Sequence, residues 1–227
     1  MADIETNTGV ADTDTGSKTV IGSFILDPDG DLTIRAGEDL GTPRDFKVCS
    51  SAVRRASPIF KERILGSWLE SKPKDHDKIW LVTLGGDEPD GLQILLQLIH
   101  ASRLAEIPTP ISIENLNSVV ALVKAYDLFH VVQPWARSWM DAAAKEAASS
   151  SSIKTIVLIN WIAWEMGNRY LFDATANTLA SQVSCDANNG LRDTNGDRLE
   201  EESFVVHVPS KLRPSWIKPI RGLYGDP

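Results

Sequence analysis

Two short stretches near the N-terminus show the hydrophobic pattern of β-strands. Leu32 and Ile34 alternate with polar residues in segment 31–35, which is the period-two pattern of a strand with one buried face. The apolar segment 24–26 precedes it, and a Pro-Asp-Gly turn at 28–30 separates the two. We therefore predict that segments 24–26 and 31–35 pair as a hairpin.

Two more strands are predicted further along the chain. Phe46 and Val48 repeat the alternation after a Gly-Thr-Pro turn at 41–43. The segment 79–84, Ile-Trp-Leu-Val-Thr-Leu, is apolar almost throughout. Such a continuous run is typical of a strand that is buried on both faces.

Between these strands the pattern changes to that of two short helices. Ser50 or Ser51 is a suitable N-cap for the first helix, in which Val53 and Ala56 face inward. The Ser-Pro pair at 57–58 ends that helix and begins the second, because proline is favoured in the first turn of a helix.

Three longer helices follow the fourth strand. Apolar residues recur at spacings of three and four within 89–104, within 112–126 and after 127, as in helices with one buried face. The Ser-x-x-Asn sequence at 112–115 caps the second of these helices. The periodic apolar positions are Leu92, Leu95, Leu96 and Ile99, then Leu116, Val119, Val120 and Val123, then Val131, Trp135 and Trp139.

A serine run at 149–152 is the best internal boundary in the chain. Beyond it, Ile156, Ile159 and Trp164 indicate an amphipathic helix, and segment 170–183 is predicted to be its antiparallel partner. Two helices of this length are too short for an independent domain. We therefore expect the pair to dock on the preceding helices.

Charge and composition exclude several classes of function. The 227 residues carry a formal net charge of -8, which argues against binding to nucleic acid or to a membrane, because neutralising phosphates requires clustered Lys and Arg. Only the proline-interrupted C-terminal tail is locally basic. Cys49 and Cys185 lie far apart and form no CxxC pair, and no leader or membrane span is recognisable. We expect a cytoplasmic or nuclear protein.

The sequence gives little support for a metal-binding site. Asp193, Asn195, Gly196 and Glu202 match four positions of a calcium loop, but Leu191 stands where the first carboxylate belongs. A polar hairpin turn is the better interpretation of that segment. The histidines are scattered, with no pair at a metal-binding spacing; they are His76, His100, His130 and His207.

Catalytic motifs are also lacking. The sequence contains no phosphate-binding loop, no dinucleotide-binding glycine turn and no nucleophile elbow. We therefore predict no catalytic, cofactor or metal site and interpret the protein as a non-enzyme. The tryptophan pairs 135/139 and 161/164 could line a binding groove, but aromatic residues at helical spacing are more often core, and we predict core.

The stretch from Asp31 to Phe60 resembles the centre of the BTB/POZ domain. In that family a strand that begins with Asp precedes a run Phe-x-x-His-x-x-x-Leu-x-x-x-Ser-x-x-Phe. The matching positions here are Phe46, Cys49, Val53, Ser57 and Phe60. The Ser-Pro before the last Phe, the Val-Cys-Ser at 48–50 and the Glu-Ser-Lys at 70–72 are most similar to the fungal branch of the family, and the resemblance covers about residues 24–141.

The resemblance implies an α+β fold, with a small mixed sheet flanked by a helical cluster and followed by a C-terminal helix pair. It divides the chain into four parts: a disordered acidic arm (1–19), a BTB/POZ-like domain (20–148), a docked helical extension (149–185), and a polar loop with a proline-interrupted basic tail (186–227). Some family members have a charged pocket built from the strand Asp and a base. Here Asp31 matches the acid, whereas Ser50 replaces the base.

The resemblance also implies a function and a candidate site. We expect a protein-interaction module that associates with itself or with another BTB chain. The alternative is a substrate adaptor of a cullin-based ubiquitin ligase, because Trp68, Leu69 and Glu70 resemble the hydrophobic-x-Glu element that contacts the cullin. Against this, a Trp that anchors a loop beside a solvated Glu would look the same, and no substrate-binding repeat domain is recognisable.

Overall fold

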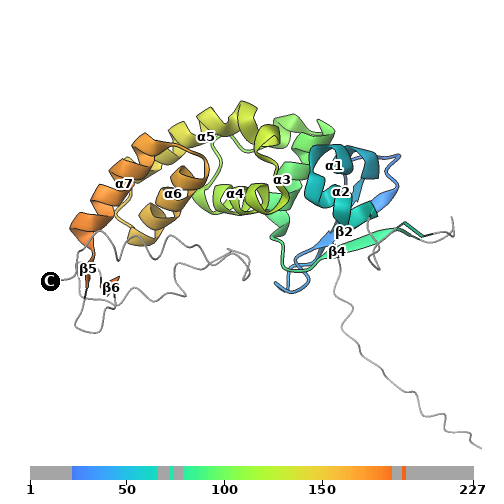
Figure 1. Cartoon of the computed structure of the whole chain (residues 1–227), viewed down its shortest axis with the longest axis horizontal. Helices are drawn as coiled ribbons and strands as arrows, with labels where there is room; N and C mark the ends of the chain where they lie inside the picture. Colours follow the sequence, from blue (N-terminus) through green and yellow to red (C-terminus); the bar gives the residue numbers. More distant parts are fainter. Residues whose placement is uncertain (1–21, 66–71, 74–78, 186–190, 193–227) are drawn as a thin grey trace, which may run out of the picture.

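The structure is a computed structural model that describes residues 22–65, 72–73, 79–185 and 191–192. In the described part, a small four-stranded mixed sheet lies at one end and seven helices extend from it to the other end (Figure 1). The predicted α+β class is therefore confirmed. The predictions for residues 1–19 and for most of 186–227 fall outside the described residues.

The sheet has the strand order β1-β3-β2-β4. Its strands are β1 (Gly22–Ile25), β2 (Leu32–Ala36), β3 (Arg44–Val48) and β4 (Leu81–Leu84). Strands β2 and β3 are antiparallel, with Ile34 opposite Phe46, whereas β1 and β4 run parallel to their neighbours. Gly37 begins the β2–β3 connection at a φ of 73°, and a Cβ there would lie 2.6 Å from the Thr42 carbonyl oxygen, so this turn requires glycine.

The predicted hairpin between segments 24–26 and 31–35 is wrong. Strand β1 pairs with β3, in parallel, and Phe24 lies opposite Phe46. Both edges of β2 are already occupied, one by β3 and the other by β4, so β1 has no free edge of β2 to join. The backbone N–H of Leu26 donates to the Lys47 carbonyl oxygen as the chain leaves β1.

The prediction that segment 79–84 is buried on both faces is also wrong. Val82 and Leu84 are buried, whereas Leu81 and Thr83 are only half-buried, and Ile79 before the strand is 80% exposed. Leu81 and Thr83 lie opposite Thr33 and Arg35, which are also only half-buried, so the sheet is fully buried on one face only.

The two short helices form as predicted, but the first one begins differently. Helix α1 (Ser50–Ala56) has Cys49 as its N-cap and no side-chain capping bond. Ser50 lies inside the helix, and its hydroxyl donates to Asp31 instead, so neither Ser50 nor Ser51 is the cap. Helix α2 (Pro58–Leu65) begins at the predicted proline, and the Ser57 hydroxyl accepts the N–H of Phe60 at 3.0 Å.

The three longer helices are confirmed with adjusted ends. They are α3 (Pro89–His100), α4 (Ile113–Tyr126) and α5 (Phe129–Ser149). Helix α3 ends earlier than predicted, because Ala101 adopts a left-handed conformation with φ 49°, and a separate 3-10 turn covers Leu104–Glu106. The Ser112 hydroxyl accepts the N–H of Asn115, as the predicted cap requires.

The C-terminal helix pair is α6 (Ile153–Glu165) and α7 (Arg169–Gln182), followed by the short strands β5 (Ser184–Cys185) and β6 (Leu191–Arg192). The helices are antiparallel, since Trp164 at the end of α6 contacts Phe172 near the start of α7, and Asn160 further back bonds Thr175. The described helices include none that is long and apolar enough to span a membrane.

One hydrophobic core joins the sheet to the helix pair. It runs from Phe46 in the sheet through α3 and α4 to Trp161 in α6 and Leu171 in α7. The predicted core role holds for one member of each tryptophan pair: Trp139 and Trp161 are buried. Trp135 is half-buried and also packs against this core, whereas Trp164 is 58% exposed.

Candidate partner-binding surface

The candidate element Trp68-Leu69-Glu70 lies outside the described residues. Its two described neighbours fix where it starts and ends along the chain. Helix α2 ends at Leu65 before it, and Lys72 follows it.

Lys72 is anchored to the sheet by two contacts. Its Nζ lies 3.1 Å from Oδ2 of Asp31 and 5.4 Å from the centroid of the Trp80 ring. The first contact is an ion pair and the second is a cation–π contact. Although Lys72 is exposed, these contacts return the chain after the candidate element to the N-terminal end of β2 and β4.

Asp31 also holds the first turn of α1. Its Oδ1 accepts the backbone N–H of Ser50 at 2.9 Å, and its Oδ2 accepts the Ser50 hydroxyl at 3.0 Å. Burial raises the pKa of the Asp31 carboxyl, but the hydrogen bonds from Ser50 and the charge of Lys72 together outweigh burial and hold the pKa below its ordinary value. The carboxylate is thus kept ionised by the groups it organises.

Asp31, which the resemblance matches to the acid of a charged pocket, has two polar partners. The Ser50 hydroxyl donates to it, and Lys72 supplies a positive charge from another part of the chain. The basic partner of Asp31 is therefore Lys72 and not residue 50. Sequence reasoning missed Lys72, because nothing local marks a lysine that pairs across 41 residues.

His100 is a second residue that sequence reasoning did not single out. Its Nε2 accepts the backbone N–H of Cys49 at 3.1 Å, and its Nδ1 lies 2.9 Å from the Leu96 carbonyl oxygen. An imidazole that accepts at Nε2 carries its proton on Nδ1, which then donates to Leu96. His100 therefore joins the end of α3 to the start of α1.

Ser57 and Phe60 connect α2 to the end of α4. The Ser57 hydroxyl donates to the Tyr126 carbonyl oxygen at 2.6 Å, and the Tyr126 hydroxyl donates to Asp87. Phe60 is fully buried and stacks on the Tyr126 ring. Ser57 and Phe60 thus both contact Tyr126.

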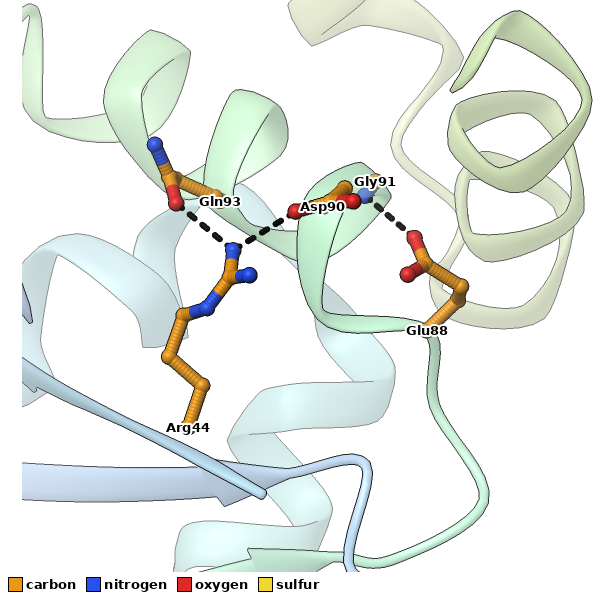
Figure 2. Close-up of polar contacts among 5 residues, drawn as sticks. All are labelled: Arg44, Glu88, Asp90, Gly91 and Gln93. Carbon is orange, nitrogen blue, oxygen red and sulfur yellow. Dashed lines mark hydrogen bonds and ion pairs between the residues drawn. The ribbon is translucent and has the colours of Figure 1, made fainter. Parts of the chain in front are cut away.

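The N-terminus of α3 is tied to β3 by a polar cluster (Figure 2). One nitrogen of the Arg44 guanidinium donates to Asp90 at 2.7 Å and to Gln93 at 2.9 Å, while Glu88 accepts the N–H of Gly91 at 2.8 Å and caps the helix. All three interactions have clear structural roles. This cluster therefore supports the scaffold.

Exposed apolar side chains mark the outer strands. Ile25 in β1 is 50% exposed and Ile79 beside β4 is 80% exposed. Among the described residues, β1 and β4 each pair with a strand on one side only. An open strand edge with an exposed isoleucine favours pairing with another chain.

The described residues contain no group of three side chains that could hold a metal ion. His130 is exposed on α5, and His76, His207 and the calcium-loop residues lie outside the described part of the chain. The Cys49 thiol is free and partly exposed.

A comparison with protein-family models finds no match to the chain, and a comparison with curated proteins finds no similar sequence.

Proposed function

We propose that the protein is a non-enzymatic interaction module of the BTB/POZ type, which associates with itself or with another BTB chain in the cytoplasm or nucleus. The observation that carries this proposal is the joint packing of the family positions. Phe46, Val53, Ser57 and Phe60 are all fully buried, and the last two contact Tyr126. These positions thus serve as the centre of the scaffold, as the resemblance implies.

The two outer strands support association as the activity of that scaffold. Ile25 and Ile79 place apolar surface beside strand edges that the described residues leave open. A lysine at an exposed strand edge opposes edge-to-edge pairing, because its charge would be desolvated in the new ladder. The sites of association can therefore be tested by substitution without disturbing the buried core.

Light scattering on the purified chain over a range of micromolar concentrations tests the proposal. We expect a dimer or larger assembly that Ile79→Lys or Ile25→Lys weakens. Leu104→Lys, at another exposed apolar residue, is the matched control and should not weaken it. A chain that remains monomeric, and that recovers no BTB protein when affinity-purified and analysed by mass spectrometry, would contradict the proposal.

One observation favours the adaptor as a second candidate. Lys72, which follows the Trp68–Glu70 element two residues later in the sequence, pairs with Asp31 and lies over the Trp80 ring. An anchored residue beside a binding element reduces the entropy that the element loses on binding. Direct calorimetric titration with a purified cullin distinguishes this candidate from the first.

A further inference from the structure

The corner where α1 meets α2 is strongly basic. Residues 50–65 contain four basic residues and a single acidic one. Among those whose side chains are described, Arg55 and Lys61 are exposed and Arg54 is half-exposed. We call Arg54, Arg55 and Lys61 the basic corner. Figure 1 shows α1 and α2 side by side at the sheet end of the molecule.

The three charges of the basic corner lie close together in sequence and have no acidic partner among the described residues. Arg35, Arg44 and Lys72 are paired with Asp45, Asp90 and Asp31 respectively, and further ion pairs occur on the 3-10 turn and on the later helices. No such pair is found at Arg54, Arg55 or Lys61 in the described part of the chain. The charge of this corner is therefore available to an anion.

Two further features suit the basic corner to an acidic peptide. Ile59 lies between Arg55 and Lys61 in sequence and is 44% exposed, so α2 presents apolar surface as well as charge. The Nε of Arg54 is buried and has no hydrogen-bond acceptor. An unsatisfied donor is unfavourable, and Arg54 gains a hydrogen bond if its guanidinium turns toward an incoming carboxylate.

The chain itself contains a segment of complementary chemistry. Residues 1–18 hold four carboxylates and a single lysine. Asp3-Ile4-Glu5 places an apolar side chain between two carboxylates, which matches Ile59 between Arg55 and Lys61. Opposite charges at the rim and an apolar contact at the centre are the arrangement that protein interfaces use.

The position of the first strand makes this contact reachable. Gly22 begins β1 opposite Arg44, and β3 then runs from Arg44 to Val48, directly before α1. Gly22 is thus about 20 Å along the sheet from the start of α1. The 16 residues between Glu5 and Gly22 give 17 residue steps, which can span up to about 56 Å, far more than this path requires. Because the two partners share one chain, their effective concentration is high.

We propose that the acidic arm, residues 1–18, binds the basic corner of its own chain through Asp3-Ile4-Glu5. The arm then covers the α1–α2 surface, and any other acidic segment must displace it to bind there. This inference depends on the charges of the chain and not on the identity of a BTB partner.

Carbodiimide cross-linking of the full-length chain, followed by mass spectrometry, tests the proposal, because the reagent joins a carboxylate to a lysine amine only when the two are close. In dilute solution at low salt we expect a link between Lys61 and Asp3 or Glu5. Raising the salt from about 0.05 M to about 0.5 M should reduce it several-fold, since the Debye length shortens from above 10 Å to below 5 Å.

Arg55→Glu should likewise reduce the link several-fold, whereas Lys145→Glu on α5 is the matched control and should leave it unchanged. A melting curve confirms that each variant is folded, and the salt series tests the native chain without any substitution. Equal linkage of the arm to Lys145 and Lys154, or a yield that ignores salt, would overturn the proposal. A mixture of isotope-labelled and unlabelled chains should give no mixed products; if it did, a second copy's arm would be the occupant instead.

Discussion

The ring of Phe60 lies parallel to the ring of Tyr126, with centroids 4.2 Å apart and planes inclined by 7°. Phe60 comes from α2 and Tyr126 from the last turn of α4. The stack joins helices that begin 55 residues apart in the sequence. Together with the Ser57 hydrogen bond to the Tyr126 carbonyl oxygen, it fixes the short helices on the helical cluster.

Replacing Phe60 should therefore weaken the contact between α2 and α4. We expect Phe60→Ala to lower the free energy of unfolding by about 3–5 kcal/mol, through lost burial and the cavity left beside Tyr126. Urea titration measures the change, and Ile59→Ala, at the exposed neighbour, is the control that should change it by less than about 1 kcal/mol. A loss below about 1 kcal/mol for Phe60→Ala would contradict its central position.

Much of this contact between α2 and α4 could be predicted from the sequence. The family resemblance matched Phe46, Val53 and Phe60 to positions that are all buried in the structure, and Ser112 marked the start of α4. Local patterns succeed here because helix caps and periodic apolar faces depend on neighbours within a few residues.

The errors concern partners that are distant in sequence. Whether β1 joins β2 depends on β4, whose residue Leu81 takes the place opposite Thr33. The contact of His100 with Cys49 spans 51 residues, and an isolated histidine gives no local sign of it. Local sequence patterns therefore do not show which strand edges and which backbone groups already have a partner in the tertiary fold.

The pH dependence of stability should show the contribution of Asp31. Its pKa is lowered in the folded protein, so its contribution is present above the unfolded pKa of about 3.9 and disappears as the pH falls through the lower folded value. At neutral pH we expect the native chain to be more stable than Asp31→Asn by less than about 1 kcal/mol, because the carboxylate is partly exposed. The difference should decrease as the pH falls through the lowered folded pKa of Asp31.

Urea titrations of both proteins between about pH 2.5 and pH 7 measure this difference, and comparing variants cancels the titration of all other groups. Asp29→Asn, in the neighbouring exposed turn, is the matched control. A difference between native and Asp31→Asn that stays constant across the acid range would show that the ionised carboxylate is not the stabilising form.

His100 should contribute to stability through a backbone group of another element. In His100→Ala the N–H of Cys49 loses its acceptor at the start of α1, where helix N–H groups have no partner within the helix. We expect a loss of about 1–3 kcal/mol. His130→Ala, at an exposed histidine on α5, should change stability by less than about 0.5 kcal/mol. Equal effects for the two histidines in urea titration would refute the bridging role.

The choice between the self-associating module and the ligase adaptor depends on Glu70. The resemblance assigns the cullin contact to Trp68 and Glu70, and an aromatic anchor with a charged neighbour usually dominates such an interface. We expect Glu70→Ala to leave the melting temperature unchanged, because a single surface carboxylate contributes little to folding. We also expect calorimetry to detect no cullin binding by the native chain. The opposite result would establish the adaptor: the native chain binds the cullin at micromolar affinity and Glu70→Ala abolishes that binding. Glu62→Ala, on α2, is the control and should then preserve binding. Different effects of the two substitutions would show that the cullin contacts Glu70 directly.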